Sequence, residues 1–151
     1  MPRMLSKNFS LDELIFSQTA SRKKINNAPD AATLTNLKRL AETLELVRSA
    51  LGVSPILISS GYRSPALNKV VGGSQKSSHM NGLAVDFTAP HYGTVLATAK
   101  AVARSGIIFD QVIFEYGRWV HLGLAESSAL ARAELLSIGD SQVYIPGLRT
   151  A

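Results

Sequence analysis

Two short segments of this 151-residue sequence alternate large apolar residues with small or polar ones, as strands with one buried face do. In 83–87 the alternation turns Asp86 away from the apolar face, and in 119–124 it turns His121 away, beside Gly123. The residues expected in the core are Leu83, Val85, Phe87, Val120, Leu122 and Leu124. Both strands are therefore expected to carry polar side chains on the face that does not join the core.

A second histidine precedes the first of these strands. His79 is followed by Asn81-Gly82, a bend that folds it back toward Asp86. Two imidazoles and one carboxylate are a common catalytic zinc set, because three protein ligands leave a fourth position for water. The sequence has no cysteine, so His79, Asp86 and His121 are the expected ligands. The alternatives are a surface or core role for the histidines, a strand-end cap for Asp86, and another divalent ion in place of zinc.

The motif around these residues resembles the M15 zinc peptidases. It comprises Ser77-x-His79-x-x-Gly82-x-Ala84-x-Asp86, preceded by Ser60-Gly61-Tyr62-Arg63-Ser64 and followed by Glu115 and His121. The resemblance runs from about residue 9 to residue 124 and is strongest after residue 59. It implies D-alanyl-D-alanine carboxypeptidase, dipeptidase or phage endolysin activity on bacterial cell-wall peptides. It also implies zinc held by His79, Asp86 and His121.

The resemblance assigns the catalytic base to Glu115. Many family members carry the acidic base three residues before the last histidine, where this sequence has Arg118. Glu115 is the nearest acid, and a tight turn at Tyr116-Gly117 is expected to bring its carboxylate back toward His121. The carboxylate would accept a proton from water and return it to the leaving amine. The alternative for Glu115 is an ion pair with Arg118 or a nearby lysine.

Three further residues are expected to contact substrate. Arg63 is assigned to a substrate carboxylate or to the oxyanion that forms on attack, since its guanidinium is a planar donor that stays charged. Ser77 is expected to hydrogen-bond substrate, and Trp119, on the strand face of His121, to wall the site. The alternatives are a surface ion pair for Arg63, turn capping for Ser77 and core packing for Trp119.

The remaining patterns indicate an α+β fold with helices packed on one face of a small antiparallel sheet, which the resemblance identifies as hedgehog/D-Ala-D-Ala peptidase-like. A capping box at Ser10-Leu11-Asp12-Glu13 opens a short helix. The segments expected to be helical are 34–51, 65–70, 94–105 and 126–137; those expected to be strands are 55–59, 111–115 and 118–124, the last two forming a hairpin. Residues 71–74 are expected to be a loop bordering the cleft.

Composition bounds the protein class. A hydrophobic content of 46% over 151 residues fits one domain spanning 1–151, with the zinc-site core at about 55–125 and a C-terminal tail after about 138. No apolar run approaches the roughly 18 residues of a membrane span, and residues 1–7 lack the apolar stretch of a secretory signal. We therefore expect a monomer without stable membrane association, made in the bacterial or host cytoplasm and acting in the periplasm or cell wall.

Charge and resemblance together leave three functional hypotheses. The net charge of +5 favours anionic partners, which include bacterial envelopes; the cluster at 22–24 carries no aromatic interleaving, so no nucleic-acid partner is expected. The first hypothesis is a phage or prophage endolysin acting on peptidoglycan stem peptides and released by a holin-type pore protein. The second is a D-Ala-D-Ala carboxypeptidase or dipeptidase acting on wall precursors. The third, kept open by Arg118, is a non-catalytic zinc-stabilised binding or virion module.

Overall fold

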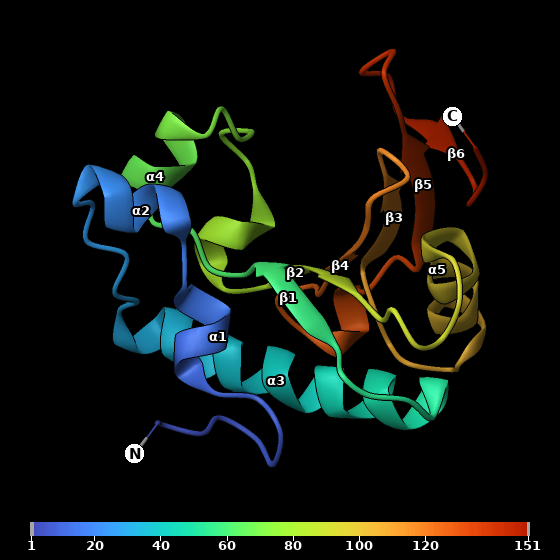
Figure 1. Ribbon diagram of the computed structural model, residues 1–151, viewed down its shortest axis with the longest axis horizontal. Helices are drawn as coiled ribbons and strands as arrows, with labels where there is room; N and C mark the ends of the chain where they lie inside the picture. The colour runs from blue at the N-terminus through green and yellow to red at the C-terminus, as the bar shows by residue number, and fades with distance from the viewer. Residues whose placement is uncertain (1, 151) are drawn as a thin grey trace.

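A mixed six-stranded sheet forms the centre of the computed structural model, which describes residues 2–150. The strand order is β1-β2-β4-β3-β5-β6 (Figure 1). The strands are β1 (Leu57–Ser60), β2 (Ala84–Thr88), β3 (Gln111–Glu115), β4 (Trp119–Gly123), β5 (Glu134–Ile138) and β6 (Ile145–Pro146). Neighbouring strands are antiparallel except β3 and β5, which are parallel. The predicted α+β fold is confirmed, with a mostly antiparallel sheet in which β3 and β5 form the parallel pair.

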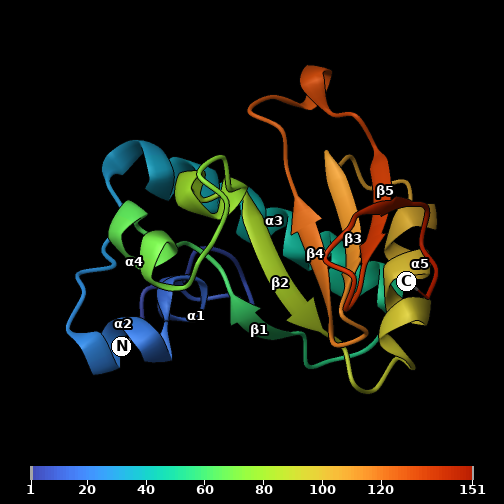
Figure 2. The ribbon, with the colours of Figure 1, turned by 90° about the horizontal axis from the view of Figure 1, so that it is seen from above.

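Helices cover one face of the sheet and one end of the molecule. They are α1 (Leu11–Ile15), α2 (Gln18–Lys23), α3 (Ala31–Leu51), α4 (Pro65–Val70) and α5 (Val95–Arg104), with short 3-10 helices η1 (Ser78–Asn81) and η2 (Ser128–Leu130). The long α3 runs behind the strands and α5 lies beside them, while α1, α2 and α4 gather at the β1 side (Figure 2). Within residues 2–150, no helix combines the length and apolar character needed to cross a bilayer.

Capping interactions define the boundaries of α1 and α3. At the start of α1, the Ser10 hydroxyl accepts a hydrogen bond from the Glu13 N–H, and the Glu13 carboxylate accepts one from the Ser10 N–H, which completes the predicted capping box. In α3, the Asp30 carboxylate accepts from the Thr33 N–H at 2.8 Å. This helix ends at Gly52, whose φ of 67° is the left-handed conformation that favours glycine.

The core confirms the alternation of the two site-bearing strands. Val85 and Phe87 of β2 and Val120 and Leu122 of β4 are fully buried. They join one apolar cluster with the buried stripe of α3 and with α5 residues. The opposite face of the same strands carries Asp86 and His121, which are buried from solvent by other parts of the chain. One sheet face thus packs the core and the other presents polar side chains.

Residues 126–137 are not the predicted helix. They form the short turn η2 and then β5, which pairs in parallel with β3. Ala133 has a φ of 52°, a conformation that interrupts any helix, and the Ala133 and Glu134 N–H groups donate to the carbonyl oxygens of Phe109 and Asp110. The prediction was wrong because pairing with β3, a partner distant in sequence, outweighs the local helix propensity of this segment.

Two other predicted segments differ from the structure. The strand expected at 55–59 begins only at Leu57 and forms β1, an edge strand in which exposed and partly buried residues alternate. Residues beyond about 138, expected to form a tail, return to the sheet as β6 and pair with β5. The C-terminal segment is therefore part of the sheet, and Tyr144, just before β6, lines the same cavity as Asp86 and His121.

Candidate metal centre and active site

His79, Asp86 and His121 converge on one point of the polar sheet face. The Asp86 Oδ1 lies 2.9 Å from His121 Nδ1 and 3.3 Å from His79 Nε2. One ligand atom from each residue lies within 4.8 Å of the other two. Asp86 and His121 come from β2 and β4, where they are directly paired, and His79 comes from η1. Register between neighbouring strands thus brings together residues 35 positions apart.

The position of His79 is set by local structure around η1. The Ser77 hydroxyl caps this turn by accepting from the His79 N–H at 3.2 Å, and Gly82 ends it with a φ of 70°. A Cβ atom at Gly82 would lie only 2.9 Å from the Thr33 carbonyl oxygen, so close packing also requires glycine there. The His79 Nδ1 lies 2.7 Å from the Gly61 carbonyl oxygen. Because that oxygen can only accept, Nδ1 carries the proton and Nε2 faces Asp86.

This donor set fits a divalent cation such as zinc. Two imidazole nitrogens and one carboxylate oxygen are ligands that zinc prefers, and three of them leave one position open. The contact of His79 with the Gly61 carbonyl is the outer hydrogen bond that typically orients a ligating histidine. Burial acts to raise the pKa of Asp86, but hydrogen bonds with His121 and His79 outweigh it and hold that pKa well below its usual range. The carboxylate is therefore charged at neutral pH, as a metal ligand must be.

Glu115 ends β3 and faces the same cavity. Its Oε1 accepts a hydrogen bond of 2.7 Å from Trp119 Nε1. Tyr116 and Gly117 form the predicted turn with φ values of 58° and 67°, and the Arg118 N–H donates to the Glu115 carbonyl oxygen at 3.0 Å. Burial is the main cause that raises the pKa of Glu115, with the charges of His121 and Asp86 acting in opposite directions. A carboxylate with a raised pKa takes up a proton more readily near neutral pH.

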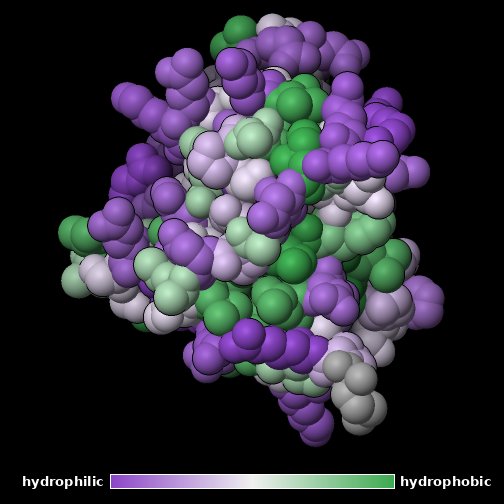
Figure 3. All heavy atoms as spheres, turned by 90° about the vertical axis from the view of Figure 1, so that its left-hand side faces the viewer, coloured by the Kyte–Doolittle hydropathy of each residue, from purple (hydrophilic) through white to green (hydrophobic). Residues whose placement is uncertain are grey.

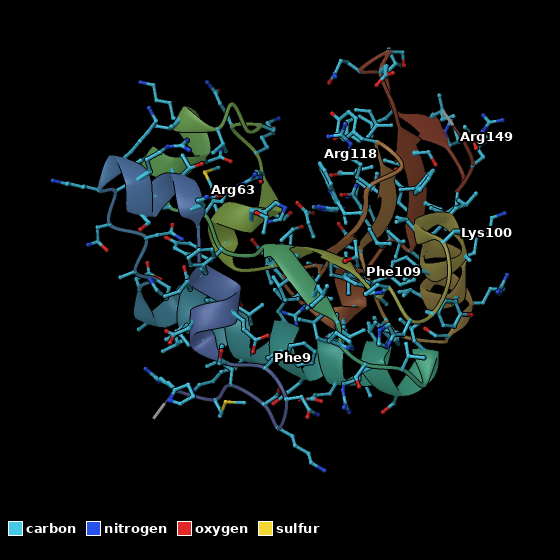
Figure 4. The ribbon with its side chains drawn as sticks, in the orientation of Figure 1. Phe9, Arg63, Lys100, Phe109, Arg118 and Arg149 are labelled. Atoms are coloured by element: carbon cyan, nitrogen blue, oxygen red, sulfur yellow. The ribbon has the colours of Figure 1, made fainter. Side chains whose placement is uncertain are left out.

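Arg63 lies across the cavity from the β3–β4 turn. Its Nη2 donates to the Ser77 hydroxyl at 3.1 Å, and its backbone N–H donates to the His79 carbonyl oxygen at 3.0 Å. Its Nε is buried with no hydrogen-bond partner among residues 2–150. Burial lowers the pKa of Arg63, with Asp86 and Glu115 opposing that effect. Figure 4 labels Arg63 on the α4 side and Arg118, which is exposed and does not line the cavity, near the turn.

The cavity that contains these groups has a volume of about 570 Å³. It holds every residue predicted for the site, and the loop 71–74 borders it as expected. It also includes Gln111, Tyr116, Leu136 and Tyr144, which the sequence patterns did not indicate. Leu136 and Tyr144 come from the segment misassigned as helix and tail, so their approach to the site depends on strand pairing that no local pattern signals.

Comparison with known proteins gives two matches. The family model described as Peptidase M15 matches residues 7–123. A zinc D-Ala-D-Ala carboxypeptidase from Streptomyces albus G is 40% identical over 63 residues, which cover 42% of this chain and 24% of that protein. The match thus spans about a quarter of the relative's length. Zinc, named for that relative, suits the donor set of His79, Asp86 and His121. Since the family match covers most of the chain, the protein belongs to the Peptidase M15 family of zinc peptidases.

Proposed function

We propose that this chain hydrolyses peptide bonds in the stem peptides of bacterial peptidoglycan, with bonds next to D-alanine as the first candidates. The observation that carries the proposal is the geometry of one cavity. His79, Asp86 and His121 offer three ligand atoms within 4.8 Å of one another, and the Glu115 carboxylate lines the same space. The substrate class follows the name of the carboxypeptidase relative and is a proposal for this chain.

The metal is assigned to His79 through Nε2, to His121 through Nδ1 and to the Asp86 carboxylate, the atoms that face one another. Zinc at these ligands would supply Lewis-acid chemistry that activates water and polarises a carbonyl group. The three residues hold their donor atoms in place before binding, since strand register fixes two of them and the Gly61 carbonyl fixes the third. Little rearrangement is therefore needed to accept the ion.

Glu115 is proposed as the general base. Its carboxylate accepts the proton of the attacking water and donates it to the leaving amine. The hydrogen bond from Trp119 to Oε1 orients the carboxylate and leaves Oε2 to handle the proton. Burial raises the pKa of Glu115 and brings its proton affinity closer to that required near neutral pH. Trp119 is thus a positioning residue as well as part of the cavity wall.

Arg63 is proposed to bind the substrate. Its guanidinium suits a substrate carboxylate or the negative charge that develops on the attacked carbonyl oxygen. The Ser77 hydroxyl accepts from Nη2 and thereby fixes the direction of this donor. An unpartnered Nε provides a further donor in the same side chain. Ser77 is proposed to act mainly through Arg63, because it already caps η1.

The charge of the chain supports action on intact walls. A net charge of +5 favours association with anionic envelope polymers. A wall-lytic enzyme of the endolysin type is therefore the form of this activity that we propose, and a carboxypeptidase acting on soluble precursors is the alternative. The two differ in their products, since the first releases peptide fragments from walls and the second releases single D-alanine residues.

The test uses the zinc-loaded chain with purified peptidoglycan and with a soluble peptide ending in D-Ala-D-Ala. New amino groups and released D-alanine are measured, then measured again after chelation and after zinc is restored. We expect zinc-dependent release, unchanged in Arg118→Ala because that side chain lies outside the cavity. No release from either substrate by a fully metal-loaded chain would refute the peptidase proposal and favour a binding module.

A further inference from the structure

A second cavity lies beside the metal site, on the β1 side of the molecule. Its volume of about 400 Å³ falls within the roughly 300–1,000 Å³ typical of ligand pockets. This edge-strand cavity is lined by residues 16–19 and 58–60, together with Tyr62, Arg63, Leu67 and Val71. It is thus enclosed by the junction of α1 and α2, by β1 and by α4. None of the residues predicted for the metal site belongs to it except Arg63.

The edge-strand cavity adjoins the metal-site cavity. Arg63 and Val71 line both, so the two spaces meet at these side chains. Arg63 reaches Ser77 on the metal side through Nη2, while its Nε has no partner among the described residues. A substrate chain held near the metal that extends beyond Arg63 and Val71 would reach the second space.

One wall of the edge-strand cavity is the open edge of the sheet. β1 pairs with β2 on one side, and no strand of residues 2–150 pairs with its other side. The end of α1 lies near β1 and makes a main-chain hydrogen bond just beyond it, where the Tyr62 N–H donates to the Leu14 carbonyl oxygen at 2.7 Å. Edge strands present unpaired N–H and C=O groups, and extended peptides bind to such edges by adding a strand. Residues 58–60 offer this edge next to the metal site.

The side chains that line the edge-strand cavity suit a peptide segment without charged side chains. Phe16 is 68% exposed and Val71 is 43% exposed. Both side chains line the cavity, where a bound peptide would cover them. Figure 3 looks onto the α1, α2 and α4 side, where apolar side chains lie exposed among polar ones. No carboxylate is among the described lining residues, and Arg63 is the cation there. Apolar contact and main-chain hydrogen bonds are thus the interactions on offer.

We propose that the edge-strand cavity binds the arm of an extended peptide substrate that continues past Arg63. The inference rests on the proposed peptidase function and deepens it. A site with space on both sides of Arg63 takes peptides that run through it, so the preferred bonds lie inside a peptide. Phe16 contacts the side chains of this arm, and residues 58–60 bind its main chain.

The experiment compares peptides of different length. Wild-type chain is given a short peptide ending in D-Ala-D-Ala, the same peptide extended by three residues at either end, and extended peptides N-methylated at alternate amides of the added arm. We expect extension at one end to raise kcat/KM by about tenfold, the effect of one or two main-chain hydrogen bonds. N-methylation should remove that gain, since it removes the donors that pair with an edge strand.

Two variants locate the effect. Phe16→Ala removes the apolar wall and Thr19→Trp fills the space; both should lower kcat/KM for the extended peptide and leave the short one unchanged. Leu130→Ala, which removes a similarly exposed apolar side chain elsewhere, is the matched control. Thermal unfolding of each variant confirms that it folds. Cleavage without length dependence, or equal loss on both peptides, overturns the cavity proposal alone; cleavage of no peptide overturns the proposed function itself.

Discussion

Trp119 and Glu115 face each other across the β3–β4 hairpin, and the Trp119 Nε1 donates a hydrogen bond of 2.7 Å to the Glu115 Oε1. The pairing links the proposed base to a residue two positions before His121. It fixes one carboxylate oxygen and contributes to lowering the pKa of Glu115 against the effect of burial. The hairpin therefore sets both the orientation and the proton affinity of this group.

Replacing Trp119 tests this relationship. Trp119→Phe keeps an aromatic wall but removes the donor, so the Glu115 carboxylate loses orientation and its pKa rises further. Because the base must be ionised to act, the acidic limb of the kcat against pH profile should move to higher pH. We expect kcat to fall about tenfold at neutral pH, with KM little changed.

The matched control for this variant is Tyr116→Phe. The Tyr116 ring lies 5.6 Å from the Trp119 ring, and its hydroxyl donates to Gln142 at 3.1 Å, away from Glu115. Its removal should weaken the contact to the C-terminal loop without moving the pH profile. A shift of equal size in both variants would show that Trp119 acts only through packing.

Metal binding should stabilise the folded chain. Because the three ligand atoms converge only in the native fold, zinc at about 100 times its dissociation constant should raise the unfolding temperature by about 5–10 °C. Asp86→Asn should abolish the rise and reduce bound zinc. His91→Ala, which removes an exposed histidine outside the cavity, should keep both. Thermal scans with metal analysis provide the measurement, and an undiminished rise in Asp86→Asn argues against this ligand set.

The proposed role of Arg63 in substrate binding should depend on the paired donors of its guanidinium and not on its charge alone. Arg63→Lys keeps the charge but loses paired donors, so kcat/KM should fall by about 10- to 100-fold. Ser77→Ala removes the acceptor of Nη2 and should cause a smaller loss of the same kind. Arg118→Lys is the control, since Arg118 is exposed outside the cavity. Steady-state kinetics on a soluble peptide measure these changes. If Arg63→Lys had the same kcat/KM as Arg118→Lys, the substrate-binding role of Arg63 would be contradicted.

The ion pair between Asp110 and Arg132 should make the free energy of unfolding depend on pH. Arg132 donates to both Asp110 oxygens at 2.9 and 2.8 Å, which is the main cause that lowers the pKa of Asp110. A lowered folded-state pKa gives stability that is present above about pH 4 and is lost as pH falls through the folded value. Because Arg132 is largely exposed and Asp110 is only partly buried, solvent screens the pair, and Asp110→Asn should cost only about 0.5–1 kcal/mol at pH 7.

Urea unfolding at pH 7 and near pH 3 measures this contribution. The difference between wild type and Asp110→Asn should shrink at the lower pH, where the wild-type carboxyl begins to bind a proton. Asp140→Asn, at an exposed carboxylate outside this ion pair, should show little difference at either pH. A penalty that does not change with pH would mean that the side chain matters for its shape and not for its charge.

Short-range sequence patterns predicted that the three candidate metal ligands would converge. Alternation along 83–87 and 119–124 was enough to assign the faces of Asp86 and His121, because side chains on a strand alternate strictly. The turn that ends at Gly82 was visible in the sequence as Asn81-Gly82. In each case the determining interaction lies within a few residues, so the sequence itself carries the signal.

Features that depend on distant pairing were missed. The segment 126–137 has helix-forming residues, yet its last part forms β5 and pairs with β3. In the chain, β4 separates these two strands. The pairing of β5 with β3 carries Leu136 to the cavity, and the pairing of β6 with β5 brings Tyr144 there. The hydrogen bond between Trp119 and Glu115 depends on hairpin register, and the edge-strand cavity depends on how α2, α4 and β1 come together around it. None of these leaves a periodic trace in the sequence.

The most direct test of the central claim is Glu115→Gln, assayed for peptide hydrolysis with bound zinc measured in the same preparation. The substitution keeps the shape of the side chain and an oxygen that can accept from Trp119, but it removes the base. We predict a full complement of zinc and a loss of hydrolysis of about 10²- to 10⁴-fold. Hydrolysis at the wild-type rate in the zinc-loaded variant would contradict the assignment of Glu115 as the base of this site.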